Sequence, residues 1–451
     1  MKRSRNRLPF GMSAGRATAL ALGVSAPLAL WVFSSMMSAD SAVAKADRAG
    51  DAPPPSAVAE AMASQTPRQP TTTGLRRVAD APTDRSPEGR LLEIYRLIGA
   101  GQMDEALRRA EGLVNDIPNF QLAQLTYGDL LMARTAPIAA PGGAAPVSGK
   151  AAEKLAQLRE EAQRRIAALQ ERPPEGAVPA QFIDLPASTR HAIAVDASRS
   201  RLYLFENGPK GLQLVSDHYA SIGKLGAEKN VQGDQRTPIG VYYITSRLEP
   251  AQLTDFYGSG ALPLNYPNEY DRKLGRTGSG IWLHGVPSDS YARSPKSTDG
   301  CVALANPELK AIMDRVQPRT TPVVIAHALN WITNDTLEAE RRNMRNLLEG
   351  WRVARASGDI NRLMSFYSPQ FSAGSRDLRQ WRQLLERETV NQRGRQLQIK
   401  DVAILGWRDR SDILVVTFGE LNEGERTGAV KRQYWTKEDG LWKIFFEGVI
   451  G

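Results

Sequence analysis

The stretch of residues 278–306, GSGIWLHGVPSDSYARSPKSTDGCVALAN, decides how this chain is read. It contains Cys301, the sole cysteine of 451 residues, and His284, one of four histidines. A single cysteine cannot form an intramolecular disulfide, so Cys301 is either a small buried side chain or a chemically used thiol. Gly300 leaves the backbone before it uncrowded, and the amides of Gly300 and Cys301 are therefore able to point at a developing oxyanion.

His284 ends an apolar run, Ile281-Trp282-Leu283, which is typical of a buried strand, and Gly285 ends that strand. This arrangement predicts a histidine base beside a cysteine nucleophile, because a nearby imidazolium lowers a thiol pKa from about 8.5. Spacing alone leaves open that Cys301 and His284 are structural residues. A lone cysteine is more often structural than catalytic, and a lone histidine at a strand end is usually a satisfied polar group.

The pattern H-G, a loop and then S-T-D-G-C-V resembles the signature of the L,D-transpeptidase catalytic domain of the YkuD type. A second segment, residues 233–242 (GDQRTPIGVY), is similar to the G-D-x-x-T-P-x-G-x-Y/F turn of that family. The resemblance covers residues 188–328 and implies a mostly β catalytic domain with a few helices. Alternating strand-like runs at residues 193–195, 201–205, 212–222, 241–244 and 321–326 agree with it.

The resemblance implies a two-step acyl transfer on peptidoglycan stem peptides. Cys301 would attack the L-to-D peptide bond of a stem tetrapeptide while His284 takes the thiol proton. The carbonyl of Gly285 would orient the imidazole, and the amides of Gly300 and Cys301 would hold the oxyanion. No metal and no cofactor is expected, since the other histidines have no paired spacing and no nucleotide-binding glycine motif is present.

The sequence departs from the family pattern at two positions beside the cysteine. Many members carry His or Arg where this chain has Asp299, and Arg where it has Ala303. That arginine is a contact for a substrate carboxylate, so its loss leaves donor and acceptor open. We expect the substrate to be bound by four other residues, of which the three charged ones could equally be solvated surface groups: Lys224, Arg236, Arg293 and Thr298.

The composition is that of a globular chain with a basic excess. Net charge is +9 and the isoelectric point is near 9.6, with 41% hydrophobic residues. No Lys/Arg cluster is interleaved with aromatic residues, which argues against a nucleic-acid partner. A polyanionic cell wall, a membrane surface or simple solubility explains the charge equally well.

Residues 1–46 predict an export segment, with a basic start, an uncharged run at 17–37 and Ala44-Lys45-Ala46 as a cleavage site. The uncharged run is also long enough for an uncleaved anchor, which would be the only membrane contact. Either outcome predicts a periplasmic location. Residues 47–89, rich in Pro, Ala, Thr and Asp, predict a disordered linker.

Residues 90–135 predict a helical hairpin similar to a tetratricopeptide unit, although one degenerate repeat is weak support. Residues 136–187 predict a linker and a charged helix at 154–170 whose apolar stripe is Leu155, Leu158, Ile166 and Leu169. Asn306 is expected to cap a helix at residues 307–316, since Pro307 suits a first helical position.

Residues 335–451 predict a separate unit, with helices first and then strands at 402–407, 412–421, 430–435 and 441–446. The order resembles the cone-shaped domains of the nuclear-transport-factor-like and SnoaL-like families. We expect a binding or dimerisation module there, able to hold an envelope protein partner.

The expected architecture is therefore multidomain α+β: a helical N-terminal segment, a mostly β catalytic domain and a C-terminal cone with a curved antiparallel sheet. The expected function is a peptidoglycan L,D-transpeptidase. Two alternatives stay open: a hydrolase or endopeptidase of the same family, which releases cross-links or wall-attached protein, and an inactive envelope scaffold that binds partners through its helical and C-terminal parts.

Overall fold

The computed structural model describes residues 85–135, 141–143, 148–391, 396–407, 413–425 and 428–450. The predicted export segment and most of the predicted linker of residues 47–89 lie outside this described part. Among the described helices, none has both the length and the apolar character that crossing a membrane requires.

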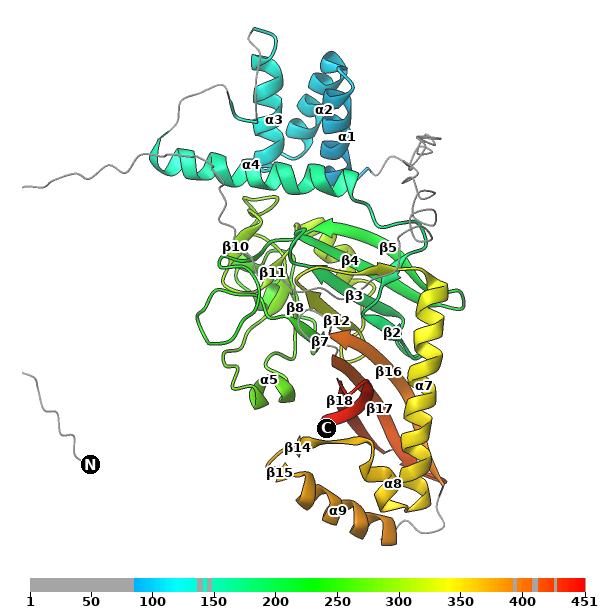
Figure 1. Cartoon of the computed structure of the whole chain (residues 1–451). Coiled ribbons are helices and arrows are strands. Elements are labelled where there is room, and N and C mark those ends of the chain that lie inside the picture. The colour runs from blue at the N-terminus through cyan, green and yellow to red at the C-terminus, as the bar shows by residue number, and fades with distance from the viewer. Residues whose placement is uncertain are drawn as a thin grey trace, which may run out of the picture. The chain divides into compact units, whose positions relative to one another are not determined.

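Four helices form the first part, here called the helical module (residues 86–170): α1 (Pro87–Gly99), α2 (Met103–Asp116), α3 (Gln121–Met132) and α4 (Gly149–Gln170). Ser86 caps α1 by accepting a hydrogen bond from the Gly89 amide, and Pro87 occupies its first turn. Gly101, with φ of 73°, turns the chain between α1 and α2. The helical character predicted for residues 90–135 is confirmed by α1, α2 and α3 (Figure 1).

The buried face of α4 differs from the prediction. The predicted apolar stripe is only half-buried, whereas Glu161, Ala162 and Arg165 are the buried residues of this helix. Charged side chains are buried when they have partners, and here Arg165 pairs both with Glu161 and with Glu88 of α1. The hydrophobic pattern pointed to the wrong face because the core of this helix is ionic.

The catalytic part is built on a five-stranded sheet in the order β5-β4-β3-β12-β7. Its strands are β3 (His191–Asp196), β4 (Arg201–Gly208), β5 (Gly211–Tyr219), β7 (Gly240–Tyr243) and β12 (Pro322–Ala326). All residues of β3 and β12 are buried, which explains their continuous apolar runs. The strand-like runs predicted from the sequence are confirmed.

Smaller sheets carry the candidate site. A three-stranded sheet has the order β11-β9-β8, with β8 (Ala261–Pro263), β9 (Trp282–His284) and β11 (Val302–Ala303). A parallel pair joins β6 (Ile222–Gly223) to β10 (Lys296–Thr298). Two helices belong to the same part of the chain, α5 (Glu269–Lys273) before β9 and α6 (Asn306–Met313) after β11.

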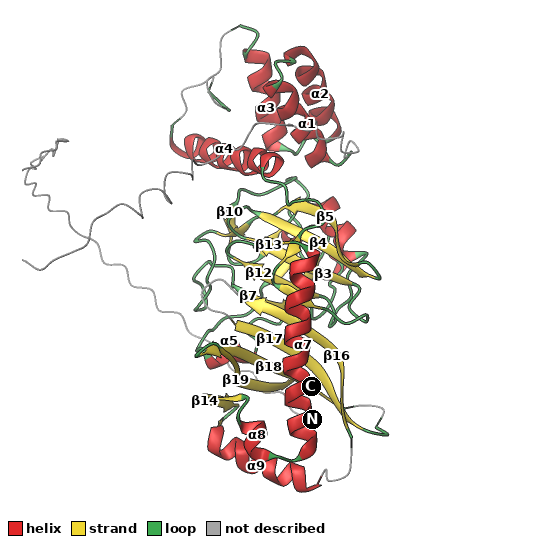
Figure 2. Cartoon of the chain, turned by 45° about the vertical axis from the view of Figure 1, so that its right-hand side comes forward, coloured by secondary structure: helices red, strands yellow, loops and turns green. Residues whose placement is uncertain are grey.

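The C-terminal part contains a seven-stranded sheet in the order β15-β14-β19-β18-β17-β16-β2. Its strands are β14 (Tyr367–Ala373), β15 (Arg376–Asp377), β16 (Leu397–Trp407), β17 (Ile413–Asn422), β18 (Ala429–Glu438), β19 (Leu441–Ile450) and β2 (Phe182–Asp184). Its helices are α7 (Asn334–Ser357), α8 (Ile360–Met364) and α9 (Leu378–Asn391). Figure 2 shows α8 and α9 at the end of this sheet away from the catalytic part.

The two faces of this sheet are buried in two different cores. Leu414 and Val416 of β17 pack with Trp351 of α7, whereas Val415 between them packs with Phe205 and Tyr203 of the catalytic sheet. The alternation is the period-two pattern of a strand buried on both sides. One face is therefore covered by α7 to α9 and the other by the catalytic part.

The strand β2 lies in the region that was predicted to be a linker and helix, residues 136–187. It pairs with β16, more than two hundred residues later, and so completes the C-terminal sheet from the N-terminal side. Another short strand of this region, β1 (Val178–Pro179), pairs with β13 (Trp331–Ile332) just before α7. The linker prediction is wrong at these two strands because both are too short to show a period.

Candidate functional site

Cys301 and His284 are brought together by the parallel pairing of β9 and β11. Val302 lies opposite Leu283, and Ala303 lies opposite His284. Side chains two positions apart on a strand share a face, so the side chains of Cys301 and His284 leave the same face of this sheet as diagonal neighbours. Cys301 is partly exposed, and its Sγ donates to the carbonyl oxygen of Gly280 at 3.2 Å.

His284 has a defined tautomer. Its Nδ1 lies 2.6 Å from the carbonyl oxygen of Gly285, which can only accept a hydrogen bond. Nδ1 therefore carries the proton and Nε2 has the free lone pair. The imidazole is 1% exposed, and this burial lowers its pKa to about 4. At neutral pH the ring is uncharged and able to accept a proton.

The thiol of Cys301 is also uncharged at neutral pH. Desolvation by the surrounding protein raises its pKa, and a backbone hydrogen bond with Trp282 acts in the opposite direction. Among nearby charges, Asp299 raises the pKa while Arg293 and Lys229 lower it. The pair is therefore a neutral thiol and a neutral imidazole on the same face of this sheet.

The turn before Cys301 is held by the hydroxyl of Thr298. This hydroxyl donates to the Cys301 carbonyl at 2.7 Å and accepts from the Gly300 amide at 3.2 Å. The structure here differs from the expectation for Gly300, since its amide is engaged inside the turn and is not free for an oxyanion. Thr298 is 2% exposed, so it supports the turn and does not line a surface.

Gly300 is needed for a steric reason. Its φ is 127°, and a Cβ at this position would lie 2.7 Å from the carbonyl oxygen of Arg236 and 3.1 Å from Ile281 Cδ1. A side chain would therefore push the turn away from the Thr-Pro segment that packs behind it. The glycine before the nucleophile fixes the backbone of Cys301.

Two of the predicted substrate-binding cations have partners inside the protein. Lys224 Nζ contacts Asp299 Oδ1 at 2.9 Å, and Gln235 Nε2 donates to the same oxygen at 3.0 Å. The guanidinium of Arg236 donates to the carbonyl of Ala227 at 3.0 Å. Both cations therefore organise the surrounding loops.

Arg293 is placed differently. Its guanidinium carbon lies 4.3 Å from the ring centre of Phe256, and that ring stacks on His284 at 5.9 Å between ring centres. Its charge acts on both His284 and Cys301, lowering the pKa of each. Within the described residues, no ion pair occupies the Arg293 guanidinium. Of the four predicted substrate residues, Arg293 is the one whose cation is both close to the nucleophile and available to an anion.

Three site residues were missed from the sequence. Phe256 and Tyr257 belong to a short 3-10 turn, and the Tyr257 ring meets the imidazole edge-on at 5.2 Å. Asn306 does not cap α6, because it is the first residue of that helix and Ala305 holds the cap position without a side-chain bond. Only the T-D-F-Y-G turn composition pointed to the aromatic pair, and that signal does not indicate a site.

The Asn306 side chain joins the two loops around His284. Its Oδ1 accepts from the amides of Ser259 at 2.9 Å and Val286 at 3.1 Å, and its Nδ2 donates to the Val286 carbonyl at 2.8 Å. A Cβ on Gly285 would lie 2.1 Å from the same Oδ1. Asn306 therefore holds the backbone whose carbonyl orients the imidazole. In the described part, no three His, Cys, Asp or Glu side chains gather as metal ligands.

Comparisons with known proteins identify two domain families in the chain. Residues 190–325 match the family model of the L,D-transpeptidase catalytic domain, YkuD, and residues 343–448 match the model of the Cds6 C-terminal NTF2-like domain. Both resemblances stated from the sequence are confirmed by these matches. A search of curated proteins gives no match.

Two solved structures are similar to a large share of this chain. Bd1075 of Bdellovibrio bacteriovorus is 26% identical, with a TM-score of 0.53, over 60% of this chain and 98% of its own. The helical cell shape determining protein Pgp2 from Campylobacter jejuni is 20% identical, with a TM-score of 0.49, over 64% of this chain and 99% of its own. The similarity to Bd1075 extends over more of the chain than the catalytic domain alone.

Proposed function

We propose that this protein, whose residues 190–325 are an L,D-transpeptidase catalytic domain of the YkuD family, is a cell-envelope enzyme acting on peptidoglycan stem peptides. Cys301 forms a thioester with the third residue of a stem tetrapeptide and releases the terminal D-alanine. An amine acceptor then takes the acyl group, giving a 3-3 cross-link or an attached protein.

His284 accepts and returns one proton in each of the two steps. The thiol hydrogen turns from the Gly280 carbonyl to Nε2 as Sγ adds to the substrate carbonyl carbon. The resulting imidazolium then gives this proton to the leaving amine, and the carbon–nitrogen bond breaks. In the second step the incoming nucleophile loses its proton to the same Nε2 and the thiol is restored. The Cys301 amide donates to the oxyanion, a contact of about 3 kcal/mol in the transition state.

One observation carries the proposal. The parallel register of β9 and β11 sets the side chain of the sole cysteine on the same face as a buried imidazole whose Nδ1 is already committed to a carbonyl. A thiol acyltransferase requires a base with a free lone pair, an accessible sulfur and a fixed nucleophile turn, and His284 Nε2, Cys301 Sγ and the turn held by Thr298 meet these requirements. Arg293 supplies the cation for a substrate carboxylate, in place of the arginine that Ala303 replaces.

Hydrolysis is the second candidate, because water can attack the same thioester. Asp299, ion-paired with Lys224 beside the nucleophile, stands where many members of the family carry a basic residue or histidine. The products would be shortened stem peptides, lost cross-links or freed wall-attached protein. In a scaffold role, by contrast, the helical and C-terminal parts would bind envelope proteins and no thioester would form.

Purified full-length protein and its Cys301→Ala variant, incubated with peptidoglycan and followed by mass spectrometry of the digested material, test this proposal. New 3-3 linked dimers support transfer, whereas tripeptides, lost cross-links or released protein support hydrolysis. No product with either protein, together with no mass gain of the wild type after a carbapenem, would leave the scaffold role. The Cys301→Ala variant in cells provides the matched test, because only a scaffold would restore the deletion phenotype without the thiol.

The proposed location is the periplasm. It depends on residues 1–46, whose composition is that of an export segment. A reporter enzyme that is active only outside the cytoplasm, fused after residue 451, checks it, and N-terminal sequencing of the mature protein distinguishes a cleaved leader from an anchor.

A further inference from the structure

The helical module contacts the segment between His284 and Cys301. This segment, residues 287–295, is here called the bridging loop. Asn119, in the turn before α3, donates from Nδ2 to the Ser288 carbonyl at 3.0 Å, and its main-chain carbonyl oxygen accepts from the Tyr291 amide at 3.2 Å. Ser294 donates from its hydroxyl to Gln157 of α4 at 3.1 Å. The two ends of the bridging loop are thus attached to two parts of the module.

Aromatic packing reinforces these contacts. The rings of Phe120 and Tyr291 lie 4.1 Å apart, and the two residues are 1% and 5% exposed. The Tyr291 hydroxyl donates to Glu308 of α6 at 2.6 Å, which ties the loop to the helix that follows the nucleophile. The bridging loop therefore lies between the helical module and the catalytic part.

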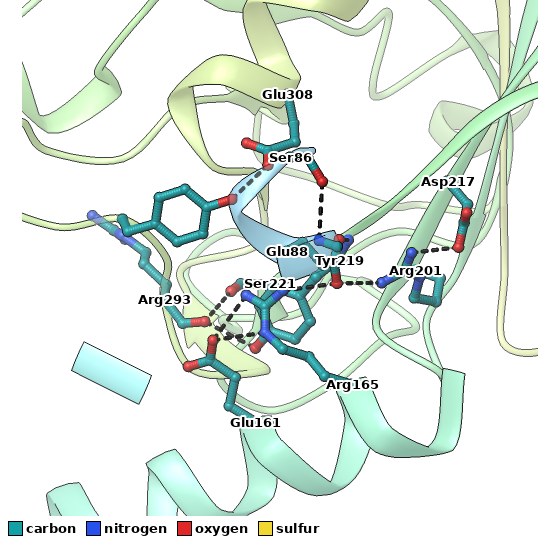
Figure 3. Close-up of polar contacts among 12 residues, drawn as sticks. Ser86, Glu88, Glu161, Arg165, Arg201, Asp217, Tyr219, Ser221, Arg293 and Glu308 are labelled. Atoms are coloured by element: carbon teal, nitrogen blue, oxygen red, sulfur yellow. Dashed lines mark hydrogen bonds and ion pairs between the residues drawn. The ribbon is translucent and has the colours of Figure 1, made fainter. Parts of the chain in front are cut away.

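A buried ionic cluster fixes the module against the catalytic sheet (Figure 3). Arg165 of α4 contacts Glu161 and Glu88, each at 2.8 Å, and Arg201 of β4 contacts Glu88 at 2.7 Å. These four residues are all buried, and buried charges are stable only with complete partners in good geometry. Buried ion pairs therefore join the module to β4.

Tyr219 connects this ionic cluster to the main chain of Arg293. The guanidinium of Arg165 lies 3.9 Å from the ring centre of Tyr219, and the Tyr219 hydroxyl donates to the Arg293 carbonyl at 2.9 Å. The Ser221 hydroxyl donates to the same carbonyl at 2.9 Å. Figure 3 shows the Tyr219 and Ser221 hydroxyls at the main-chain carbonyl of Arg293, while Arg165 contacts Glu161 and Glu88. The main chain of Arg293 is thereby fixed while its guanidinium extends over Phe256 toward His284 and Cys301.

We propose that the helical module is a positioning device for the reaction: through the bridging loop and Tyr219 it sets Arg293 beside Cys301, where Arg293 binds a carboxylate of the substrate. The part about the carboxylate rests on the proposed function. Tyr219 and Ser221 act through Arg293 and are positioning residues.

The test uses the rate at which iodoacetamide alkylates Cys301 at pH 7, which depends on the thiolate fraction and needs no peptidoglycan. The charged groups that act on this thiol are Asp299, Arg293 and Lys229. Arg293→Ala in the full chain should slow alkylation about threefold, since loss of a nearby positive charge disfavours the thiolate. Tyr219→Phe combined with Ser221→Ala should give the same direction, because it frees the Arg293 carbonyl while the ring under Arg165 stays in place.

Combined substitutions test whether Tyr219 and Ser221 affect the alkylation rate through Arg293. Adding Tyr219→Phe and Ser221→Ala to Arg293→Ala should change the alkylation rate no further.

Asn119→Ala with Gln157→Ala should increase deuterium uptake across residues 287–295, slow alkylation and raise KM for a tetrapeptide substrate more than it lowers kcat. Tyr95→Phe, which removes a hydroxyl that contacts Thr126 inside the module, is the matched control and should leave all three measurements unchanged.

Two results would overturn the proposal. In one, the loop and Tyr219 variants fold and alkylate at the wild-type rate although Arg293→Ala is slower. In the other, Arg293→Ala itself alkylates at the wild-type rate. Absence of any peptidoglycan product would instead count against the proposed function alone, because alkylation reports the geometry around Cys301 without a substrate.

Discussion

The Nδ1 atom of His284 lies 2.6 Å from the carbonyl oxygen of Gly285, the residue that follows it in the chain. The ring is thus oriented by its neighbour's backbone and not by an acidic side chain. This requires the Gly285 peptide to be fixed, and Asn306 fixes it by bonding the amide and carbonyl of Val286 on one side and the amide of Ser259 on the other. The orientation of the His284 ring therefore depends on Asn306 through the backbone of the loops that Asn306 joins.

Asn306→Ala should lower kcat about 100-fold with little change in KM, because a shift of about 1 Å in a catalytic group has effects of this size. Stability should fall by about 1–3 kcal/mol, since buried partners lose their hydrogen bonds. Turnover of a tetrapeptide and urea unfolding measure the two effects. A Ser259→Ala variant loses a hydroxyl contact to the Asn306 backbone and leaves the amide contact intact. It should retain most of kcat, and wild-type kcat in Asn306→Ala would show that Gly285 needs no support.

Folding stability should decrease as the pH falls from 6.5 to 4. His284 has a pKa lowered to about 4 in the folded protein, whereas its unfolded value is 6.5, so the unfolded state binds the proton first. The expected loss across this window is about 3 kcal/mol, from about 1.36 kcal/mol for each pH unit. Urea unfolding at several pH values measures it. His284→Gln has no such group and should show a flatter curve, and equal curves would place the acid sensitivity elsewhere.

Thr298→Val should reduce activity strongly while keeping the shape of the side chain. The hydroxyl bonds both the Cys301 carbonyl and the Gly300 amide, so its loss leaves two buried groups of the nucleophile turn without a partner. Stability should fall by about 1–3 kcal/mol. Thr298→Ser keeps the hydroxyl and should restore most of the activity in a single-turnover assay. If valine and serine behave alike, the turn is held by the backbone and not by this hydroxyl.

Asp184→Asn should weaken the attachment of β2 to α7 within the C-terminal part. Asp184 of β2 is 2% exposed and meets Arg345 of α7 at 2.6 Å. Hydrogen bonds to a charged group contribute about 1.5–3 kcal/mol, and we expect a loss in this range. Guanidinium unfolding followed by tryptophan fluorescence and by protection of Cys301 from alkylation measures whether the catalytic and C-terminal parts unfold together.

The exposed pair Arg382–Glu386 on α9 provides the control for Asp184. Glu386→Gln should change stability by less than about 1 kcal/mol, because exposed ion pairs contribute little. Equal effects of the two substitutions would mean that β2 adds nothing to the C-terminal sheet beyond its backbone pairing.

The sequence by itself determined the features that depend on local pattern. The glycine before the cysteine and the apolar runs of strand length act over a few residues, so most strands, and Cys301 and His284 as candidate site residues, could be predicted. The helix α7 was predictable for the same reason, as its buried residues recur at helical spacing up to Gly358.

Only the tertiary structure decided the contacts between distant segments. A three-residue strand such as β2 is too short to show an alternating hydrophobic pattern. Its place beside β16 depends on burial in the folded chain, which residue spacing does not reveal. The burial of Glu161 and Arg165 depends on Glu88, and the placement of Arg293 depends on Phe256 and Tyr219. A charged side chain carries no mark of whether it will be solvated or paired, because that depends on a partner supplied by folding.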